Sequence, residues 1–365
     1  MRAGRVFRRT AALGGLLGLL LILAPLLFIG SQCVGTGGPA RAREIPAAAA
    51  GVEGYARPGA STFLTLPEWY IVYSTEEYAA AIEGGAPSQF PYVGAIRQFW
   101  RYYRRVCAVT RNQYPFDTGV HLMLGVIGMS FSAENAVKGV YEKTLGRVTE
   151  WIAGHDTPED AFAARTAREY GRFMHTVPWY EFPFAAHLEA LWKDTPLWGP
   201  HMIRKWERRI VLSAEYGVKA LYGGLIRLAS RGVYDAEDLQ VSALAENVPE
   251  RAFADARIKK VKEAGPRAYV LWLPRYEAFT ETVPALTRQG VRFREIAGND
   301  EIFLTVRARR DWAFGLGPGR VVLAEPILTD RGAQRVGIVT PVAALHTVLL
   351  GLERSGAALE HLYDY

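Results

Sequence analysis

A run of twenty residues without a single charge, residues 11–30, constrains this chain more than any other feature of its sequence. The ten residues before it contain four arginines and no acidic residue. A helix of that length crosses about 30 Å of hydrocarbon and satisfies its own backbone hydrogen bonds there. Because a positively charged flank stays in the cytoplasm, we expect residues 1–30 to be a basic leader and a single transmembrane anchor. The bulk of the chain then lies on the non-cytoplasmic side of the cell membrane.

Two other fates of this N-terminus are possible. A cleaved signal peptide has a shorter apolar region and small residues at its cleavage site, but the nearest such pattern, Ala40-Arg41-Ala42, is far from the apolar run. Lipidation of Cys33 would require a small residue before it, and Gln32 is not small. Cys33 and Cys107 could pair, but Cys33 falls in a predicted linker, so we expect no disulfide. We therefore predict an uncleaved signal-anchor and a single-pass protein.

No later segment is a convincing second span. Residues 120–131 are too few to cross a bilayer, and we interpret them as a buried helix. Residues 210–229 contain Glu215, Lys219 and Arg227, which are costly in lipid. Residues 337–352 are also few and contain Pro341 and His346.

Composition excludes some classes of protein. Half of the residues are apolar and 12% are aromatic, which is enough for a packed core and excludes a disordered chain. The net charge of +6 comes largely from the arginine-rich leader, and no nucleic-acid-binding motif accompanies it. The expected partners are the lipid bilayer, through residues 11–30, and an envelope protein or an apolar ligand, but not nucleic acid.

The remaining chain divides into three parts by its patterning. Residues 31–60 are rich in Gly, Ala and Pro and indicate a flexible linker. Residues 61–233 indicate an aromatic-rich helical bundle, with helix starts at Ser74, Pro91, Asp117 and Thr157. Its longest predicted helix, over 200–230, has an apolar stripe of residues spaced by three and four, which we expect to face the core. The stripe comprises Ile203, Trp206, Ile210, Ala214, Gly217, Leu221, Leu225 and Leu228.

Residues 234–365 indicate an α+β domain. We expect short helices over 235–263, strands at 268–273, 291–296, 301–306, 320–328, 335–340 and 358–364, and helices over 276–289 and 340–354. This order resembles a ferredoxin-like split βαβ arrangement with an extra hairpin. The fold class expected for the whole chain is therefore α+β: a transmembrane helix, a helical bundle and a ferredoxin-like domain.

Polar residues of the predicted bundle are the first candidates for chemistry. They are His121, Glu134, Glu169, His175, Glu181 and His187. The chain has no Glu-x-x-His pair and no His-Glu-x-x-His motif, so we expect no metal site. A structural role is the simpler interpretation, because Arg165, Glu169 and Arg172 have ion-pair spacing. Glu134, His175 and Glu181 remain as weak catalytic candidates.

Two surfaces are candidates for binding. Trp179, Tyr180, Phe182 and Trp198 lie in proline-rich segments around Glu181 and form either a docking surface or packed corners between helices. Arginines interleave with aromatic residues over 97–105 and 204–209, a pattern that suits lipid headgroups or an anionic ligand, or else a solvated helix face. Arg101 and Arg104 are the candidates named from this set.

No cofactor motif is recognisable. Gly315, Gly317 and Gly319 lie in a loop that lacks the Lys-Ser/Thr ending of a phosphate-binding loop. His346 has no nucleophile in a Gly-x-Ser-x-Gly setting. We therefore expect no cofactor and a membrane-anchored, non-catalytic protein that binds a partner or an apolar ligand close to the bilayer. The alternatives are an enzyme with a Glu/His site inside the bundle, and a structural or assembly role in an envelope complex.

Overall fold

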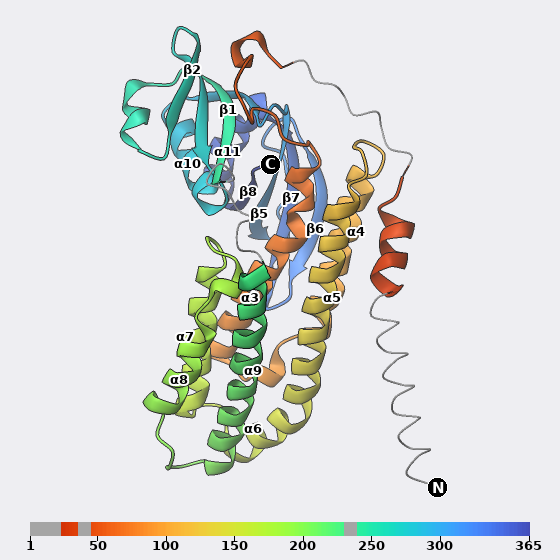
Figure 1. Ribbon diagram of the computed structural model, residues 1–365, viewed down its shortest axis with the longest axis vertical. Coiled ribbons are helices and arrows are strands. Elements are labelled where there is room, and N and C mark those ends of the chain that lie inside the picture. Colours follow the sequence, from red (N-terminus) through yellow and green to blue (C-terminus); the bar gives the residue numbers. More distant parts are fainter. Residues whose placement is uncertain (1–22, 36–44, 230–238) are drawn as a thin grey trace.

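The computed structural model describes residues 23–35, 45–229 and 239–365 (Figure 1). The predicted leader and most of the predicted anchor, residues 1–22, lie outside the described residues. So do residues 36–44 of the predicted linker and residues 230–238, where the predicted bundle and α+β domain meet.

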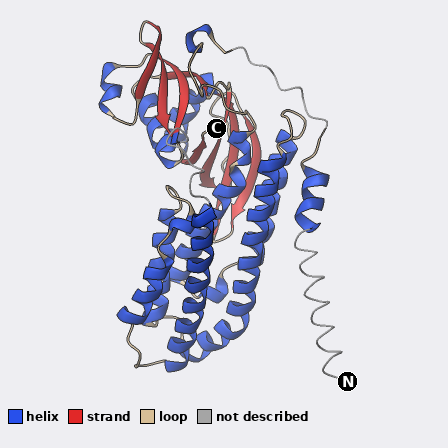
Figure 2. Ribbon diagram, in the orientation of Figure 1, coloured by secondary structure: helices blue, strands red, loops and turns tan. Residues whose placement is uncertain are grey.

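Helices dominate the described chain up to residue 229, as the blue ribbons of Figure 2 show. The described part of the N-terminal helix is Leu23–Gln32. The other helices are α2 (Ser61–Leu64), α3 (Leu66–Gly84), α4 (Tyr92–Thr110), α5 (Thr118–Tyr141), α6 (Arg147–Ala153), α7 (Pro158–Phe173), α8 (Phe184–Asp194) and α9 (Met202–Ala229). A π-helical segment, η3 (Glu142–Gly146), joins α5 to α6, and three short 3₁₀ segments are η1 (Ala47–Ala49), η2 (Pro87–Gln89) and η4 (Trp179–Glu181).

Local capping chemistry explains several helix starts. The Asp117 side chain accepts a hydrogen bond from the backbone N–H of Val120 at 3.0 Å and caps α5. Thr157 and Asp160 form a complete capping box at the start of α7. These two predicted starts and the one at Pro91 are confirmed. The start predicted at Ser74 is wrong, because Ser74 is buried inside the continuous helix α3.

Two four-stranded antiparallel sheets follow the helices, so the coarse α+β prediction is confirmed. The first sheet contains β1 (Gln240–Glu246), β2 (Lys259–Gly265), β3 (Ala268–Pro274) and β4 (Arg292–Ile296), in the order β2-β3-β1-β4. The second contains β5 (Glu301–Arg309), β6 (Arg320–Ile327), β7 (Asp330–Pro341) and β8 (Ala358–Tyr363), in the order β6-β7-β5-β8. Helix α10 (Glu277–Arg288) precedes β4, and α11 (Leu345–Ser355) precedes β8.

The two sheets therefore repeat one unit. Each unit has three strands, a helix and a fourth strand, and the corresponding strands occupy the same places in the two sheets. Every pair is antiparallel. This arrangement differs from the single ferredoxin-like sheet expected from the sequence. The short helices predicted over 235–263 are wrong at β1 and β2, which are strands. Strand β2 is a lysine-rich edge strand without the apolar alternation of an inner strand.

The two sheets share one core and have covered outer faces. Alternate residues of β5 divide between two clusters: Ile302, Leu304 and Val306 join residues of the first sheet, α10 and α11, whereas Phe303 packs with α2, α3 and α4. Residues 45–60 cover the outer face of the first sheet, where Ala49 and Tyr55 pack on Val270. These residues are thus packed, in contrast to the flexible linker expected over 31–60.

Buried ion pairs also join the helices to the second sheet. The guanidinium of Arg335 on β7 is 2% exposed and donates hydrogen bonds to Glu360 of β8 at 2.7 Å and to Glu77 of α3 at 3.2 Å. It also lies over the ring of Tyr73 at 4.1 Å. Helix α3 therefore runs from the sheets into the helical bundle as one fixed element (Figure 1).

Candidate functional site

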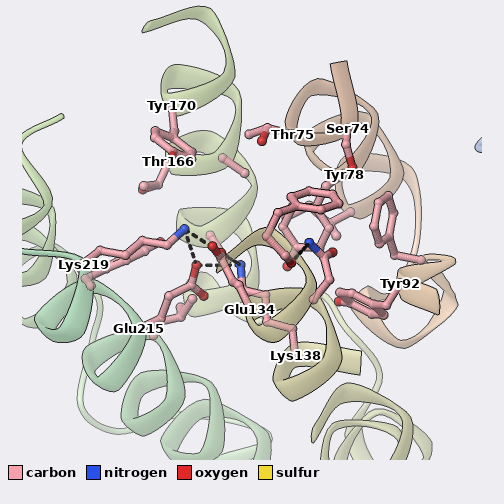
Figure 3. A pocket seen from close by; sticks show the side chains of 18 of the residues that line it. Ser74, Thr75, Tyr78, Tyr92, Glu134, Lys138, Thr166, Tyr170, Glu215 and Lys219 are labelled. Atoms are coloured by element: carbon pink, nitrogen blue, oxygen red, sulfur yellow. Dashed lines mark hydrogen bonds and ion pairs between the residues drawn. The ribbon is translucent and has the colours of Figure 1, made fainter. Parts of the chain in front are cut away.

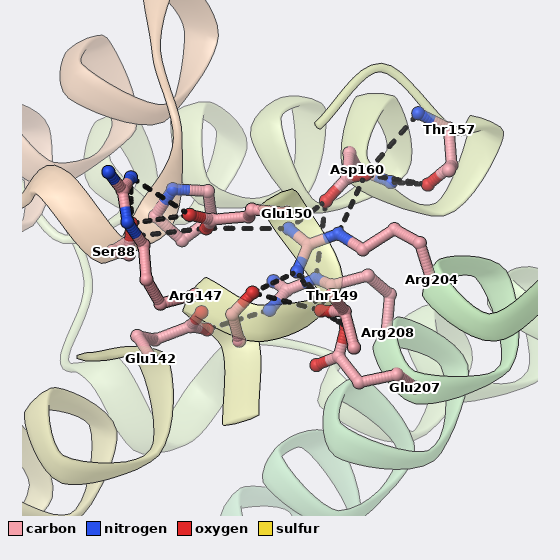
Figure 4. Close-up of polar contacts among 12 residues, drawn as sticks. Ser88, Glu142, Arg147, Thr149, Glu150, Thr157, Asp160, Arg204, Glu207 and Arg208 are labelled. Atoms are coloured by element: carbon pink, nitrogen blue, oxygen red, sulfur yellow. Dashed lines mark hydrogen bonds and ion pairs between the residues drawn. The ribbon is translucent and has the colours of Figure 1, made fainter. Parts of the chain in front are cut away.

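The interior of the helical bundle is charged. Four cations of α9, Arg204, Lys205, Arg208 and Arg209, are each exposed by 2% or less. Arg204 donates to Asp160 of α7 at 2.8 Å, and Arg208 donates to Glu142 of η3 at 2.7 Å (Figure 4). Glu159 of α7 accepts from Lys205 at 3.0 Å and from Arg209 at 2.7 Å. Because each buried cation has an acidic partner, the desolvation cost of burying it is offset.

Helix α9 is consequently turned the opposite way from the sequence prediction. Its apolar stripe faces outward, with Ile203 61%, Leu221 70% and Leu228 65% exposed. Periodicity shows that a helix has two faces, but it cannot say which one packs inward when the polar face meets complementary charges. The same correction applies to the basic residues over 204–209, which are buried and not available to headgroups or to solvent.

Helix α5 also exposes apolar residues. Leu122, Val126, Val137 and Val140 are exposed, whereas Leu124 and Phe131 are buried together with His121 and Asn135. The stretch Thr118–Ala153 is long and apolar enough to cross a membrane by length and composition, and only 22% of its most apolar window is buried. The prediction of a buried helix over 120–131 is therefore wrong, because only one side of α5 packs on the bundle.

A cavity of about 80 Å³ lies higher in the bundle, among α3, α5, α7 and α9 (Figure 3). Four charged residues cross it: the Lys138 ammonium contacts Glu215 at 2.6 Å, and the Lys219 ammonium contacts Glu134 at 2.8 Å. Burial alone would raise the pKa of Glu215, but Lys138 and Lys219 outweigh burial and hold that pKa at about 2. The four charges are thus balanced and tie α5 to α9.

His175, just after α7, joins three parts of the molecule. Its Nε2 lies 2.7 Å from Glu76 of α3, and its Nδ1 lies 3.1 Å from Glu277 of α10. Hydrogen bonds to Glu277 and Glu76 raise the pKa of His175 to about 10. The imidazole is therefore a cation at neutral pH that holds α7 to α3 and to the first repeat unit.

A second histidine lies beside this cluster and is neutral. His361 of β8 is fully buried, stacks on Trp69 with a centroid separation of 3.5 Å, and has Thr280 Oγ1 at 3.0 Å from its Nδ1. Burial, together with the nearby charge of His175, lowers the pKa of His361 well below its ordinary value. Its Nε2 has no hydrogen-bond partner among the described residues.

The His175 cluster predicts a pH-dependent contribution to stability. The unfolded pKa of histidine is about 6.5, and folding raises it to about 10. The stabilisation by His175 should be complete below pH about 6.5 and should disappear as the pH rises through about 10. The free energy of unfolding of the wild type minus that of His175→Gln should shrink over this range. His155→Gln, at an exposed histidine outside this cluster, is the control. A difference between the wild type and His175→Gln that stays constant with pH would contradict the prediction.

The three weak catalytic candidates do not share one site. Glu134 pairs with Lys219 and Lys138, His175 lies between Glu76 and Glu277, and Glu181 lies 3.8 Å from Arg227. Catalysis by several groups requires them to reach one reacting centre. These three side chains therefore do not converge on one reacting centre.

The four aromatic candidates differ in their burial. Phe182 is 4% exposed and packs with Phe184 and Tyr170, and Trp179 and Tyr180 are half-buried. Trp198 alone of the four is largely exposed, at 75%. Packing between helices therefore accounts for most of this set.

The basic candidates Arg101 and Arg104 lie on the exposed side of α4. They border a second cavity, of about 320 Å³, together with Arg105, Arg111 and Gln32. Arg101 pairs with Glu325 of β6 at 3.4 Å. This cavity lies at the end of the N-terminal helix.

A disulfide bond joins Cys33, just after the N-terminal helix, to Cys107 of α4, which corrects the expectation that the two stay unpaired. Both cysteines are buried with Ile29, Phe99 and Tyr103. The distance in sequence, 74 residues, hid this proximity. The sulfurs lie close to His121, but the bond between them removes both thiolates as metal ligands.

No family model, curated protein or solved structure matches this chain. Three groups of residues could not be identified from the sequence. They are Glu76 and Glu277, which contact His175; Arg335 of β7; and the acidic residues that pair with the buried cations of α9. The sequence carries one signal for the acidic partners of α9: Glu159 and Asp160 lie at the start of one helix, and several basic residues lie near the start of another.

Proposed function

We propose that this chain is a membrane-anchored, non-catalytic protein of the non-cytoplasmic side whose helical bundle lies with one face in the bilayer. The bound partner is the hydrocarbon of the lipid itself. One observation carries the proposal: α9 turns its apolar residues outward and its charged residues inward, and α5 also exposes apolar residues, although it packs Leu124 and Phe131 inward. We define the outer face as Leu122, Met123, Val126, Val137 and Val140 of α5 with Ile203, Ile210, Val218, Leu221, Leu225 and Leu228 of α9.

In water this arrangement would be costly. Soluble monomers rarely expose large apolar patches, and patches that exceed a few hundred Å² mark interaction sites. In lipid, exposing the same apolar face carries no free-energy penalty. Charges such as those of α9, in contrast, are unfavourable in hydrocarbon unless they face inward and are paired. They are turned inward and paired, which favours lipid over water as the surroundings of this face.

The opposite side of the bundle supports a partial immersion. Helix α7 exposes Arg165, Glu169 and Arg172. These charges belong in water, so the bundle lies in the interface with α5 and α9 toward the lipid. Figure 1 shows α7 and α5 on opposite sides of the bundle.

The N-terminal anchor supports the same orientation. The last part of the charge-free run, residues 23–30, lies in the helix Leu23–Gln32, and Phe28 of that helix packs edge-on against Trp100 of α4 with centroids 4.9 Å apart. The disulfide Cys33–Cys107 holds this helix beside α4, which packs on α5. A structural disulfide also favours an oxidising, non-cytoplasmic compartment.

Photolabelling from within the bilayer tests this proposal. Full-length protein is reconstituted into vesicles that contain a phospholipid with a photoactivatable acyl chain, irradiated and mapped by peptide mass spectrometry. We expect adducts on α5, α9 and residues 11–30, and none on α7. Adducts confined to residues 11–30, or cross-links that join the outer faces of two copies, would overturn the proposal.

A matched pair of variants sharpens the result. Leu221→Glu places a carboxylate on the outer face, and Ala161→Glu places one on the exposed side of α7. Leu221→Glu should abolish the adducts on α9, because a charge in hydrocarbon is unfavourable. Ala161→Glu should leave the adduct pattern unchanged.

A further inference from the structure

The cavity of about 320 Å³ beside α4 is strongly basic. Among the described residues, its charged lining consists of Arg101, Arg104 and Arg105 of α4, Arg111 directly after it, and one acid, Glu325 of β6. Arg101 is the one that pairs with Glu325, at 3.4 Å. The cavity therefore carries an excess of positive charge.

Three of these arginines have no acceptor in the described part of the chain. Arg104, Arg105 and Arg111 are exposed, and within residues 23–35, 45–229 and 239–365 no group accepts a hydrogen bond from their side chains or forms an ion pair with them. Arg101 lies three and four residues before Arg104 and Arg105 on α4, and like charges at this spacing repel each other. An anion in the cavity would relieve this repulsion, and the planar guanidinium fork matches phosphate oxygens in particular.

The position of the cavity limits the source of the anion. Gln32, the last residue of the N-terminal helix, lines the same cavity as the arginines. It lies two residues after the charge-free run ends at Gly30, and the next residue, Cys33, is bonded to Cys107 of α4. The basic cavity is thus fixed where the anchor would leave the hydrocarbon, at the depth of the phosphates of the lipid headgroups.

We propose that this cavity binds a phosphate group, supplied by the headgroup of an anionic phospholipid. The lipid source rests on the proposed membrane function, whereas the phosphate chemistry rests on the arginines alone. Arg104, Arg105 and Arg111 hold the phosphate oxygens, whereas Arg101 is already paired with Glu325.

The test compares two triple variants of the full-length protein with equal loss of charge. The first is Arg104→Gln/Arg105→Gln/Arg111→Gln. The control is Arg172→Gln/Arg310→Gln/Arg354→Gln, at exposed arginines away from the cavity. In nanodiscs of phosphatidylcholine with added phosphatidylglycerol, native mass spectrometry measures the phosphatidylglycerol retained. We expect the first triple variant to retain it at least about tenfold less than the control, because charge-assisted hydrogen bonds are lost.

A second arm separates the two sources of phosphate. Inorganic phosphate is titrated into the detergent-solubilised protein, and binding is measured by calorimetry. Saturable binding that the first triple variant loses and the control keeps supports the phosphate site and assigns it to a free ligand. This result can hold even if acyl-chain labelling of α5 and α9 fails, so the two proposals fail independently. Equal retention of phosphatidylglycerol and equal binding of phosphate by both triple variants would overturn the site.

Discussion

Replacing Arg204 by methionine should destabilise the protein by about 3–5 kcal/mol, the range found when one partner of a buried ion pair is removed. Arg204 has no exposed surface and contacts Asp160 at 2.8 Å, Glu207 at 3.0 Å and Glu150 at 3.7 Å. Without the guanidinium, these carboxylates are left close together in the interior of the bundle. The midpoint of thermal unfolding in mild detergent is the measurement.

The matched control is Arg172→Met, at an exposed arginine of α7 without an ion pair to the described residues. It should change the free energy of unfolding by less than about 0.5 kcal/mol. Arg204→Lys should still be destabilising, since an ammonium cannot reproduce the fork geometry. If Arg204→Met and Arg172→Met were equally stable, the charged interior would not be a structural element.

Removing the disulfide should have a comparable effect. The bond closes a loop between residues separated by 74 positions, and loop-closure entropy for that length corresponds to about 4 kcal/mol. The double variant Cys33→Ser/Cys107→Ser should therefore unfold at a lower temperature than the oxidised wild type. Its helix Leu23–Gln32 should also exchange its amide hydrogens faster, because Cys33 no longer fixes the helix to α4.

A reducing agent supplies the control for this prediction. Dithiothreitol should lower the unfolding temperature of the wild type to that of the double variant and leave the double variant unchanged. An unfolding temperature that is the same for oxidised wild type and double variant would show that packing of Ile29 and Phe28 alone holds the N-terminal helix.

Local signals in the sequence were sufficient for several elements. The caps at Asp117 and Thr157 act over three residues, so their partners are visible in the sequence itself. The strand at 358–364 alternates in polarity and forms β8 as predicted. Features of this kind depend on neighbours within one turn of helix or one strand.

The orientation of α9 could not be predicted in the same way. This helix has two distinct faces, and the usual assumption is that the apolar face packs inward. Here Glu159 and Asp160, more than 40 residues away in sequence, neutralise the basic face of α9. Only the three-dimensional arrangement brings these charges together, so the usual assumption gave the wrong face.

Prediction of the candidate site from the sequence fails for the same reason: its residues contact partners that are distant in the sequence. Glu76 and Glu277 lie 99 and 102 residues from His175, and nothing in their local sequence marks them as its partners. Arg101 and Arg104 were identified because the basic and aromatic pattern of α4 is local. That they border a cavity with Gln32 depends on the disulfide, whose two cysteines lie 74 residues apart in the sequence.

The repeated unit of the sheets has a consequence for how the C-terminal part holds together. The two units meet at a tight turn that contains Gly298, with φ of 67°. A chain cut at this turn would leave each product with every strand of its own ladder, but with only half of the interior that both sheets enclose. Neither product could then fold alone, and the two would have to reassociate to exclude water. The hydrogen bonds between strands form within each repeat, whereas the hydrophobic core is built by the two repeats together.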